Sequence, residues 1–458
     1  MEQERFHELR RNTIIIAASN IGSKAMVFLL APLYTYFLSS EQYGITDLVT
    51  SSIGLIVPFL CFDIYEATFR YVNDDKYDAR KTLCTSLATC FPGIIIAILL
   101  GITIGVRNWI IIAVLCFSII TEINSILSQY LRGLKDMLGF AASGMITAVI
   151  LFLSSMIFVV FLKWELVGWV VSYGLALIFS GFYLIFKTRL FSVFSIKNIS
   201  QEYLRDFIYF CLPLVPTAAM WWIMNVSDRY IITLFLGVSA TGIYAVANKI
   251  PAILTTLERV FYQAWQISSI DAYKNKGGRD EVYSEVFNKY FALLSVGSLG
   301  LMAIGKECIF TFFEKDYRDA WLCLALLILA VMIHALAGNL GTLYSTFKDT
   351  KGAFYSTLIG SVTNIVLNII FIYKFGIVGA AVATICGYLV TLIYRVWDVR
   401  KFVSIKLEDK KNLLLLLMLF AQLFFYYYEG PIFICMKWIV FISALVMNRK
   451  IIARILRK

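Results

Sequence analysis

The sequence predicts an all-α polytopic membrane protein with about 14 transmembrane helices, arranged as two related six-helix lobes and a C-terminal helix pair. Three observations predict this class. The 458 residues are 60% hydrophobic and 16% charged, whereas a soluble chain carries roughly 25% charged residues. Apolar runs long enough to cross about 30 Å of hydrocarbon recur along the whole chain. A short motif also occurs once in each half.

The repeated motif relates the two halves of the chain. The pattern Thr-x-Phe-Leu-x5-Gly-Ile begins at Thr35 and recurs at Thr233, 198 residues later. In both places one long apolar segment precedes the motif and another follows it. Duplicated halves are the usual architecture of alternating-access transporters, which handle their substrate between the halves.

The expected spans follow one another with short connections. Spans one to six form an N-lobe at 1–187, a basic cytoplasmic linker occupies 188–205, and spans seven to twelve form a C-lobe at 206–400. Residues 401–458 hold spans thirteen and fourteen and a basic cytoplasmic tail. In order, the spans are expected near 12–38, 45–69, 82–105, 108–130, 138–161, 166–186, 206–236, 240–270, 287–311, 319–347, 351–373, 376–398, 411–428 and 431–448.

Prolines interrupt three of these spans. Pro58 lies inside the second span, Pro213 and Pro216 lie near the start of the seventh, and Pro251 lies inside the eighth. Proline removes a backbone hydrogen bond and bends a helix. We expect bends at these positions, which suit alternating access.

Basic residues predict the orientation of the chain. With the N-terminus inside, inner segments hold 30 of the 41 Lys and Arg residues, and outer loops hold six. This positive-inside bias places both termini in the cytoplasm. It also accounts for the net charge of +11, so no nucleic-acid partner is expected. The tail from Met447 to Lys458 is expected to lie on the anionic inner leaflet, in contact with membrane lipids.

The composition argues against enzymatic chemistry. Two histidines and nine scattered cysteines without a CxxC pair predict no metal site. The segment Gly300-x4-Gly305-Lys306 imitates a phosphate-binding loop, but Glu307 stands where Ser or Thr is required. We therefore predict a transporter without a cofactor. Uphill work would draw on an ion gradient, the membrane potential or the substrate's own gradient.

Polar stripes on many spans predict a hydrated central cavity, because charges in hydrocarbon are costly and normally face protein or water. At about 1.5 Å per residue, Lys24 and Lys249 lie near mid-membrane, and Arg259 lies deeper toward the inside. Such cations suit an anionic substrate such as a phosphate or diphosphate. The expected polar lining comprises Asn20, Asn225, Arg229, Asn248 and Asn364.

Carboxylates in the spans are candidates for binding a coupling cation or a proton. Glu258, together with Arg259, also fits a side chain that extends toward the cytoplasmic face. The candidates are Asp63, Glu66, Glu122, Asp228 and Glu258.

Other candidates have structural alternatives as well. Glu66 and Arg70 also fit a local helix pair near the inner boundary, and Asp228 also fits a neutralising partner of Lys249. His334 fits either a hydrogen-bonded neutral side chain or a proton relay.

Several short motifs, in their order and spacing over residues 12–400, carry a family resemblance. They are Asn20-x-Gly22 and Pro32, Tyr43-Gly44, Ala67-x-Phe69-Arg70-Tyr71, Leu131-Arg132-Gly133, Pro213…Pro216…Asp228-Arg229-Tyr230…Gly242-Ile243-Tyr244-Ala245…Lys249-Ile250, and Gly376-Ile377-Val378-Gly379-Ala380-Ala381. With these motifs the chain resembles polysaccharide or O-antigen flippases of the Wzx type, within the multidrug/oligosaccharidyl-lipid/polysaccharide exporter superfamily.

The resemblance implies two six-helix lobes around a cavity that opens alternately to each side. It implies movement of an undecaprenyl-diphosphate-linked oligosaccharide from the inner to the outer leaflet of a bacterial plasma membrane, and polysaccharide polymerase machinery as a further partner. By this analogy Lys24, Lys249 and Arg259 would meet the diphosphate. Cationic positions vary among such flippases, so these assignments depend on depth in the membrane.

Three other functions compete with this interpretation. An ion-coupled multidrug or cation exporter of the same superfamily would favour a cavity richer in acidic groups. A lipid II flippase would differ in substrate and share the mechanism. A membrane glycosyltransferase or polymerase would need large outer loops and metal or nucleotide motifs, which this sequence lacks.

Overall fold

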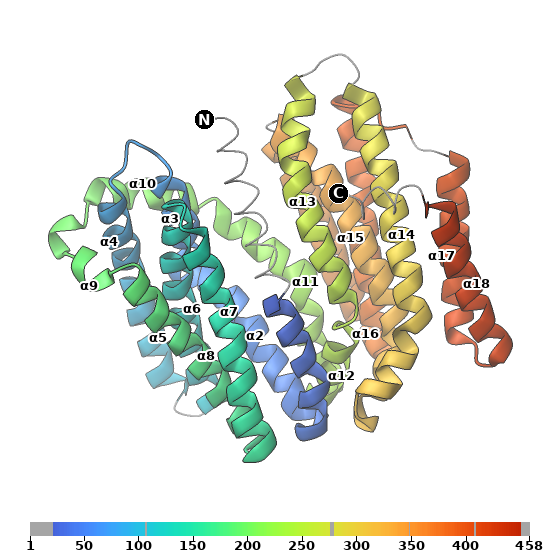
Figure 1. Cartoon of the computed structure of the whole chain (residues 1–458), viewed down its shortest axis with the longest axis horizontal. Helices are drawn as coiled ribbons and strands as arrows, with labels where there is room; N and C mark the ends of the chain where they lie inside the picture. Colours follow the sequence, from blue (N-terminus) through green and yellow to red (C-terminus); the bar gives the residue numbers. More distant parts are fainter. Residues whose placement is uncertain (1–21, 106–107, 275–278, 348, 407–408, 450–458) are drawn as a thin grey trace. The chain divides into compact units, whose positions relative to one another are not determined.

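The computed structural model describes residues 22–105, 108–274, 279–347, 349–406 and 409–449. Its regular elements over these ranges are helices. The chain divides into two compact units, Met1–Trp222 and Ile223–Lys458, which we call unit 1 and unit 2. Figure 1 shows the helices of each unit along the sequence.

Unit 1 consists of long helices joined by short turns. Residues 22–37 are helical, and helix α11 (Leu214–Leu236) begins in unit 1. The other elements are α2 (Ser40–Cys61), α3 (Ile64–Val72), α4 (Ala79–Thr89), α5 (Phe91–Thr103), α6 (Trp109–Gly133), α7 (Met137–Ser155), the π-helix η2 (Met156–Phe161), α8 (Glu165–Lys187), α9 (Leu190–Val193), the 3₁₀-helix η3 (Ile196–Asn198) and α10 (Gln201–Cys211).

Local chemistry defines both ends of α2. Ser39 and Gln42 form a capping box, in which each side chain accepts a hydrogen bond from the backbone amide of the other residue. Near the other end, Pro58 removes one backbone donor. Phe62 and Asp63 then adopt left-handed conformations with φ of 57° and 51°, which separate α2 from α3. Unit 1 therefore contains a helix break at the carboxylate Asp63.

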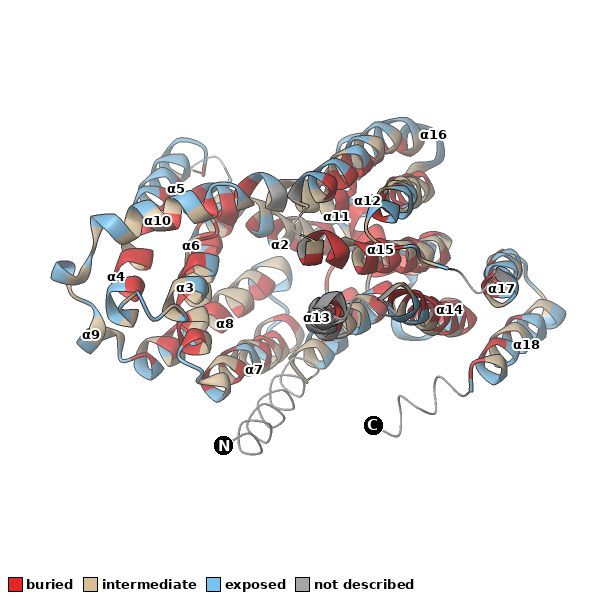
Figure 2. Cartoon of the chain, turned by 90° about the horizontal axis from the view of Figure 1, so that it is seen from above, coloured by how far each residue is buried: buried red, intermediate tan, exposed pale blue. Residues whose placement is uncertain are grey.

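The core of unit 1 lies where α3, α4, α6 and α10 meet. Ile64, Leu83, Ile126, Leu127 and Phe207 are fully buried there and belong to one hydrophobic cluster. In Figure 2, buried residues lie along one side of these helices, and exposed residues lie along the opposite side. This pattern is typical of helices that pack on one another with their other face in lipid.

Unit 2 contains the rest of α11 and the helices that follow. They are α12 (Val238–Ala247), α13 (Pro251–Lys274), α14 (Arg279–Phe312), the 3₁₀-helix η4 (Lys315–Ala320), α15 (Trp321–Phe347), α16 (Thr350–Asp398), the 3₁₀-helix η5 (Val399–Lys401), α17 (Asp409–Tyr427) and α18 (Pro431–Met447). Helix α15 is at the centre of this unit, since it contacts α12, α13, α14, α16 and α17. Figure 2 shows that much of α15 is buried.

Helix α16 consists of two arms that meet at a kink. Gly376 has φ +62° and ψ −144°, a backbone conformation that favours glycine. The two arms approach closely at Gly360 and Gly387, since a Cβ on Gly387 would lie 3.1 Å from the backbone oxygen of Gly360. Small residues permit this close approach of helices. The α16 hairpin therefore supplies two of the expected spans.

The last two helices attach to α14 through two lysine–glutamate pairs. Lys437 of α18 lies 2.9 Å from Glu307, and Lys306 lies 2.7 Å from Glu429 in the α17–α18 connection. In each pair the lysine is more buried than the glutamate, with side-chain exposures of 4% and 51% for Lys437–Glu307 and of 16% and 79% for Lys306–Glu429. The two pairs thus attach α18 and the α17–α18 connection to α14, the second pair with more solvent contact.

The helices confirm the polytopic all-α class. Nine helices among the described residues are long and apolar enough to cross a membrane, and α16 contains two expected spans. Every expected span coincides with helix, the first only over residues 22–37, because 12–21 lie outside the described residues. Large apolar side chains such as Phe161 and Phe186 are more than 70% exposed, as expected of a lipid-facing surface.

The proline positions interrupt helices as expected. Pro213 lies in the turn between α10 and α11, and Pro251 is the first residue of α13 after the turn at 248–250. Pro58 lies in the last turn of α2. Pro216, by contrast, lies inside the continuous helix α11, and bending at the prolines stays a prediction.

Candidate functional site

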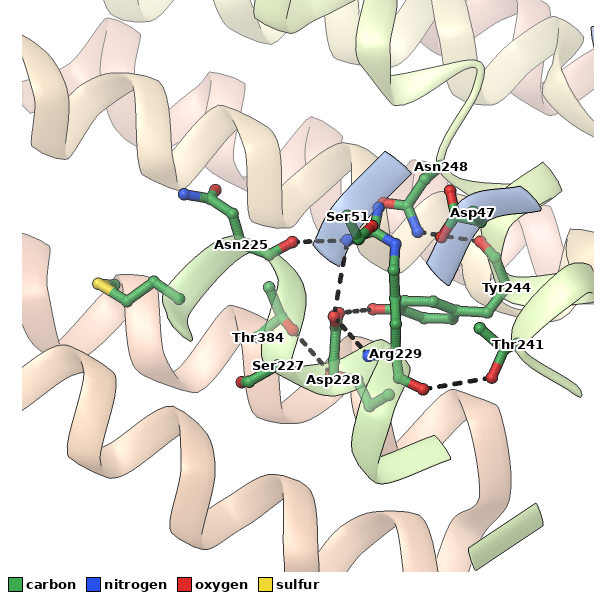
Figure 3. A network of polar contacts seen from close by, with 12 residues as sticks. Asp47, Ser51, Asn225, Ser227, Asp228, Arg229, Thr241, Tyr244, Asn248 and Thr384 are labelled. Atoms are coloured by element: carbon green, nitrogen blue, oxygen red, sulfur yellow. Dashed lines mark hydrogen bonds and ion pairs between the residues drawn. The ribbon is translucent and has the colours of Figure 1, made fainter. Parts of the chain in front are cut away.

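A buried carboxylate on α11 organises the polar centre of unit 2. Asp228 is 5% exposed and accepts a hydrogen bond of 2.6 Å from the hydroxyl of Tyr244 on α12. The backbone amide of Arg229 donates to the same carboxylate at 2.9 Å, and its guanidinium lies 3.9 Å away. Figure 3 shows Tyr244 and Arg229 directed toward Asp228. The centre thus combines one buried anion with a cation and a hydroxyl donor.

The guanidinium of Arg229 also binds the backbone of its own helix. Arg229 donates at 2.8 Å to the backbone oxygen of Asn225, one turn earlier. The backbone oxygen of Arg229 accepts from the hydroxyls of Thr233 and Thr241. These contacts hold α11 and α12 together around Asp228 (Figure 3).

Oxygen-bearing side chains of α16 lie next to this centre. Asn364 is 2% exposed, and its side-chain oxygen accepts from Asn368 at 3.0 Å and from Ser227 at 3.5 Å. The side-chain oxygen of the fully buried Asn368 has no hydrogen-bond partner within the described part of the chain. Carboxylate, amide and hydroxyl oxygens are the groups that bind hard cations.

A second polar pair joins α13 and α15. The Nδ1 atom of His334 lies 3.1 Å and 3.2 Å from the two carboxylate oxygens of Glu258. Both side chains are largely buried, with 21% and 12% exposure. The ring of Tyr388 on α16 lies 4.9 Å from the His334 ring, and its hydroxyl donates to the Asn225 side chain at 2.7 Å. The two polar centres of unit 2 are therefore connected through Tyr388.

A buried arginine completes the polar interior of unit 2. Arg395 is 3% exposed and donates hydrogen bonds to Ser356, to Thr357 and to the backbone oxygen of Ala337. These three acceptors are neutral, so the guanidinium is held by dipoles. Arg395 thereby fixes both arms of the α16 hairpin to α15.

Unit 1 contains a different kind of buried acid. Glu122 on α6 is fully buried, and neither of its carboxylate oxygens makes a well-formed hydrogen bond among the residues described, although the backbone amide of Tyr65 is close enough to act on it. Cys61, Asp63 and Glu66 lie within electrostatic range of it. Asp63 is 6% exposed at the helix break, whereas the side chain of Glu66 is exposed on α3. The break between α2 and α3 thus brings two buried carboxylates into one region.

The predicted cations lie in both units and differ in exposure. Lys24 is half-buried in the helix over residues 22–37 of unit 1. In unit 2, Lys249 is half-buried in the turn before α13, and Arg259 is exposed on α13. Asn248, in the same turn as Lys249, donates to the backbone oxygen of Tyr244 at 2.9 Å. Asn20 lies outside the described residues, and the joint role of these groups stays a prediction.

Two groups outside the spans have shifted pKa values that come from local contacts. The hydrogen bond that Tyr77 donates to Asp206 at 2.7 Å raises the pKa of the Tyr77 phenol. The hydrogen bond from Lys401 at 2.6 Å, assisted by the backbone amide of Gly352, lowers the pKa of Asp349. Both contacts fasten connections between helices.

Sequence reasoning missed three side chains that shape the site. Tyr244 appears in the sequence only as part of a family motif, and Tyr388 gives no signal there. Arg395 appears only as one of the inner basic residues that predict orientation. A mid-span tyrosine gives a weak sequence signal, because aromatic residues are common in membrane helices. The burial and partners of these side chains follow from tertiary packing.

The comparisons with known proteins decide the family. A family model described as polysaccharide biosynthesis protein matches residues 9–265, more than half of the chain. The chain belongs to the polysaccharide biosynthesis protein family. The family resemblance expected from the sequence motifs is thereby confirmed.

This polysaccharide biosynthesis protein has curated relatives in archaea and bacteria. It is 22% identical over 407 residues, 82% of this chain and 94% of the relative, to an uncharacterized membrane protein of Methanocaldococcus jannaschii. It is 27% identical over 184 residues, 40% of this chain and 39% of the relative, to a probable low-salt glycan biosynthesis flippase of Haloferax volcanii. It is 28% identical over 110 residues, 23% of each chain, to a lipid II flippase of Thermosipho africanus.

Solved structures share the fold of this polysaccharide biosynthesis protein. A lipid II flippase in an inward closed conformation superposes with a TM-score of 0.72 and 16% identity, over 97% of this chain and 100% of that chain. An inward-facing multidrug resistance transporter superposes with a TM-score of 0.68 and 14% identity. The match covers 83% of this chain and 96% of that chain. These solved structures show that the chain has the multi-pass helical fold of these transporters, and the family match places it among polysaccharide biosynthesis proteins.

Proposed function

We propose that this protein moves undecaprenyl-diphosphate-linked oligosaccharide repeat units from the inner to the outer leaflet of a bacterial plasma membrane by alternating access. Such units would serve the synthesis of surface polysaccharide. The observation that carries this proposal is membership of the polysaccharide biosynthesis family over residues 9–265. The relative named as a probable glycan biosynthesis flippase supports the same substrate class.

The diphosphate of the substrate would bind to basic side chains of the spans. Lys24, Lys249 and Arg259 are the proposed ligands, and each is half-buried or exposed. Cations form strong, charge-assisted hydrogen bonds with phosphate oxygens. The proposed polar lining for the sugar and the diphosphate is Asn20, Asn225, Arg229, Asn248 and Asn364.

The carboxylates would couple transport to an ion. Asp228 is the leading candidate for a cation, since the oxygens of Asn364 and Asn368 lie in the same polar centre. Glu258 is a candidate for a proton, because it pairs with a histidine. In unit 1 the candidates are Asp63, Glu66 and Glu122, of which Glu122 is fully buried.

The proposed mechanism uses related lobes. We assign the N-lobe to 1–187, the linker to 188–205, the C-lobe to 206–400, and the extra helix pair with its tail to 401–458. Both termini would be cytoplasmic, and the lipid tail of the substrate would stay in the bilayer. Polysaccharide polymerase machinery would receive the product on the outer side.

A strain that lacks this chain tests the substrate. Its lipids would be extracted, diphosphate-linked oligosaccharide would be quantified by mass, and the leaflet exposing the sugar would be determined. Accumulation of a complete repeat unit on the cytoplasmic leaflet is the expected result. Accumulation of lipid II would indicate the cell-wall substrate, and altered sensitivity to cationic dyes without lipid accumulation would indicate an exporter of drugs.

Lys24→Ala tests the proposed diphosphate ligand. We expect this variant to lose export while its abundance in the membrane stays unchanged. The control is Lys76→Ala, which removes an exposed lysine in the connection between α3 and α4. Normal surface polysaccharide in the Lys24→Ala strain would refute the assignment.

A further inference from the structure

Large apolar side chains are exposed on the segment that follows α8 in unit 1. Phe191 of α9 is 82% exposed, and Ile196 of η3 is 79% exposed. Phe186, in the last turn of α8, is 72% exposed, and Phe194 is also exposed. A surface that faces only water rarely gathers such side chains, so this one indicates an apolar binding partner.

The opposite side of the same segment is fastened to the core of unit 1. Leu190 and Val193 pack against the hydrophobic cluster of this unit. The backbone oxygen of Val193 accepts a hydrogen bond of 3.5 Å from the thiol of Cys84, and the backbone amide of Ser200 donates to the hydroxyl of Thr85 at 3.1 Å. These contacts hold the segment on α4, so its exposed side chains stay on the outside of the unit.

The exposed side chains continue the lipid-facing surface of α8. Phe179, Phe182 and Phe186 share one face of this helix and are all exposed. Because α8 is a candidate membrane span, this face is expected to contact lipid. Arg189 then has φ of 52° and turns the chain directly into α9, which lies at the edge of unit 1 (Figure 1). The apolar surface therefore extends from the span onto the connection at its end.

The charge of the segment complements an anionic partner. Arg189 and Lys197 are exposed, and neither makes an ion pair with a residue in the described part of the chain. Lys187 differs from them, because it pairs with Asp136 at 3.2 Å. The sequence contains no Asp or Glu from 166 to 201. Aromatic and basic side chains in one acid-free segment are typical of structures that lie in the interface of an anionic leaflet.

We propose that this surface is an anchor in the leaflet next to the end of α8, and that its partner is anionic phospholipid. Its apolar side chains insert among the acyl chains, and its two basic side chains extend to the headgroups. The inference goes beyond the proposed function, since it concerns phospholipid of the membrane and not the transported lipid. The residues that we call the linker patch are Phe186, Arg189, Phe191, Phe194, Ile196 and Lys197.

Quenching of a fluorophore by labelled phospholipids tests the linker patch. In the full-length chain, the nine native cysteines are replaced, Cys84 by serine so that a donor to Val193 remains. Ser192→Cys then carries the fluorophore next to Phe191. The nanodiscs contain phosphatidylcholine and phosphatidylglycerol, and either one or the other bears a nitroxide on its acyl chain. We expect both labelled lipids to quench, because the fluorophore lies among acyl chains.

The anionic lipid is expected to quench more strongly than the zwitterionic one. Each unpaired cation at the surface should enrich phosphatidylglycerol locally by about fivefold. The double variant Arg189→Gln with Lys197→Gln is expected to lose this preference and to keep the quenching itself. As a control for position, the same fluorophore on Lys76→Cys, in the connection between α3 and α4, should be quenched little by either lipid.

The outcomes separate the two parts of the inference from the proposed function. Absence of quenching at Ser192→Cys by both lipids would overturn the insertion. A preference for phosphatidylglycerol that is the same in the parent and the double variant would overturn headgroup binding by Arg189 and Lys197. No transported substrate is present in these nanodiscs, so either failure leaves the flippase assignment intact. Loss of the flippase assignment would likewise leave the quenching result unchanged.

Discussion

Buried ionisable groups in this protein differ in their hydrogen-bond donors and acceptors. Asp228 accepts hydrogen bonds from a tyrosine hydroxyl and a backbone amide. Arg395 donates to three neutral oxygens. Neither carboxylate oxygen of Glu122 makes a well-formed hydrogen bond among the residues that the structure describes, and the backbone amide of Tyr65 is a poorly placed donor to it. An ionised carboxylate without donors is far more costly to bury than one that is hydrogen-bonded.

Removing the ionisable group should therefore have opposite effects at the two carboxylates. Glu122→Gln is expected to keep or raise the free energy of unfolding, because a neutral amide replaces an acid whose only donor, the backbone amide of Tyr65, is poorly placed. Asp228→Asn is expected to lower it by about 1–3 kcal/mol, because the buried Tyr244 hydroxyl loses its charged acceptor. Thermal unfolding of the purified variants in detergent measures both effects. Loss of stability in Glu122→Gln would show that this acid is charged and partnered in the native protein.

Residue types within spans could be predicted from hydropathy, but their partners could not. The sequence predicts polar roles for Asp228 and Arg229 and allows Asp228 and Lys249 as a pair. The structure gives Asp228 the donors Tyr244 and Arg229. The sequence allows His334 as a relay or as a hydrogen-bonded side chain, and its partner Glu258 lies 76 residues away. Contacts at such separations depend on helix packing, which the hydropathy pattern does not contain.

At the scale of elements, the α17–α18 pair offers a controlled comparison of two ion pairs. Lys437→Ala removes a lysine whose side chain is 4% exposed and whose partner Glu307 is 51% exposed, and it is expected to speed the hydrogen exchange of α18. Glu429→Gln breaks the more solvated pair and keeps the contact of Lys306 with the Trp321 ring, so it is expected to change the exchange less. Hydrogen exchange of α18 measures both. Equal exchange in the two variants would mean that burial does not set the strength of these pairs.

The connection before α16 should respond to pH. Because the pKa of Asp349 is lowered in the folded chain, its pair with Lys401 stabilises the protein above the ordinary aspartate pKa of about 3.9. This contribution is lost as the pH falls through the folded pKa. Asp349→Asn keeps the capping ability but removes the charge. At pH 7 it should therefore be less stable than the parent by under about 1 kcal/mol, since the pair is largely solvated.

The control is to compare the unfolding temperatures of Asp349→Asn and the parent at low pH. Both proteins should unfold at equal temperatures once Asp349 is protonated in the folded state. A difference between them that persists unchanged at the lowest pH would contradict the assignment of the effect to the ion pair.

Helix ends were well predicted where proline or glycine sets the backbone. The turn at Pro213 and the break before Pro251 follow from the missing amide. The boundary expected between 373 and 376 is the kink at Gly376. The left-handed pair Phe62–Asp63 could not be predicted, because aspartate adopts that conformation more often than most residues but phenylalanine rarely does.

At the scale of the whole molecule, the orientation in the membrane is the most direct prediction. The positive-inside count places Lys76 in the cytoplasm and Lys163 outside. In a chain without its nine native cysteines, Lys163→Cys should react in intact cells with a membrane-impermeant thiol reagent. Lys76→Cys should react only after the membrane is permeabilised. The reverse pattern would invert the assigned direction of transport.

The division of the chain into halves was only partly accessible from sequence. The motif repeated at Thr35 and Thr233 predicted related lobes, and the structure divides into two compact units after Trp222. Both repeated hydroxyls donate to a backbone oxygen about one turn earlier, Thr35 to Pro32 and Thr233 to Arg229, and Thr233 also contacts Thr241. A five-residue match carries no information about contacts of the second kind. The family could be predicted because the order of the motifs along the sequence does not depend on individual side-chain contacts.

The α16 hairpin has a consequence for how the chain is made. Its two arms are joined at Gly376 without an intervening loop, and they approach closely at Gly360 and Gly387. One arm cannot insert into the bilayer while the other stays in water, because no flexible loop separates them. We therefore expect the arms to leave the translocation machinery as a pair, carrying the charge of Lys374 across the membrane in a single step during biogenesis.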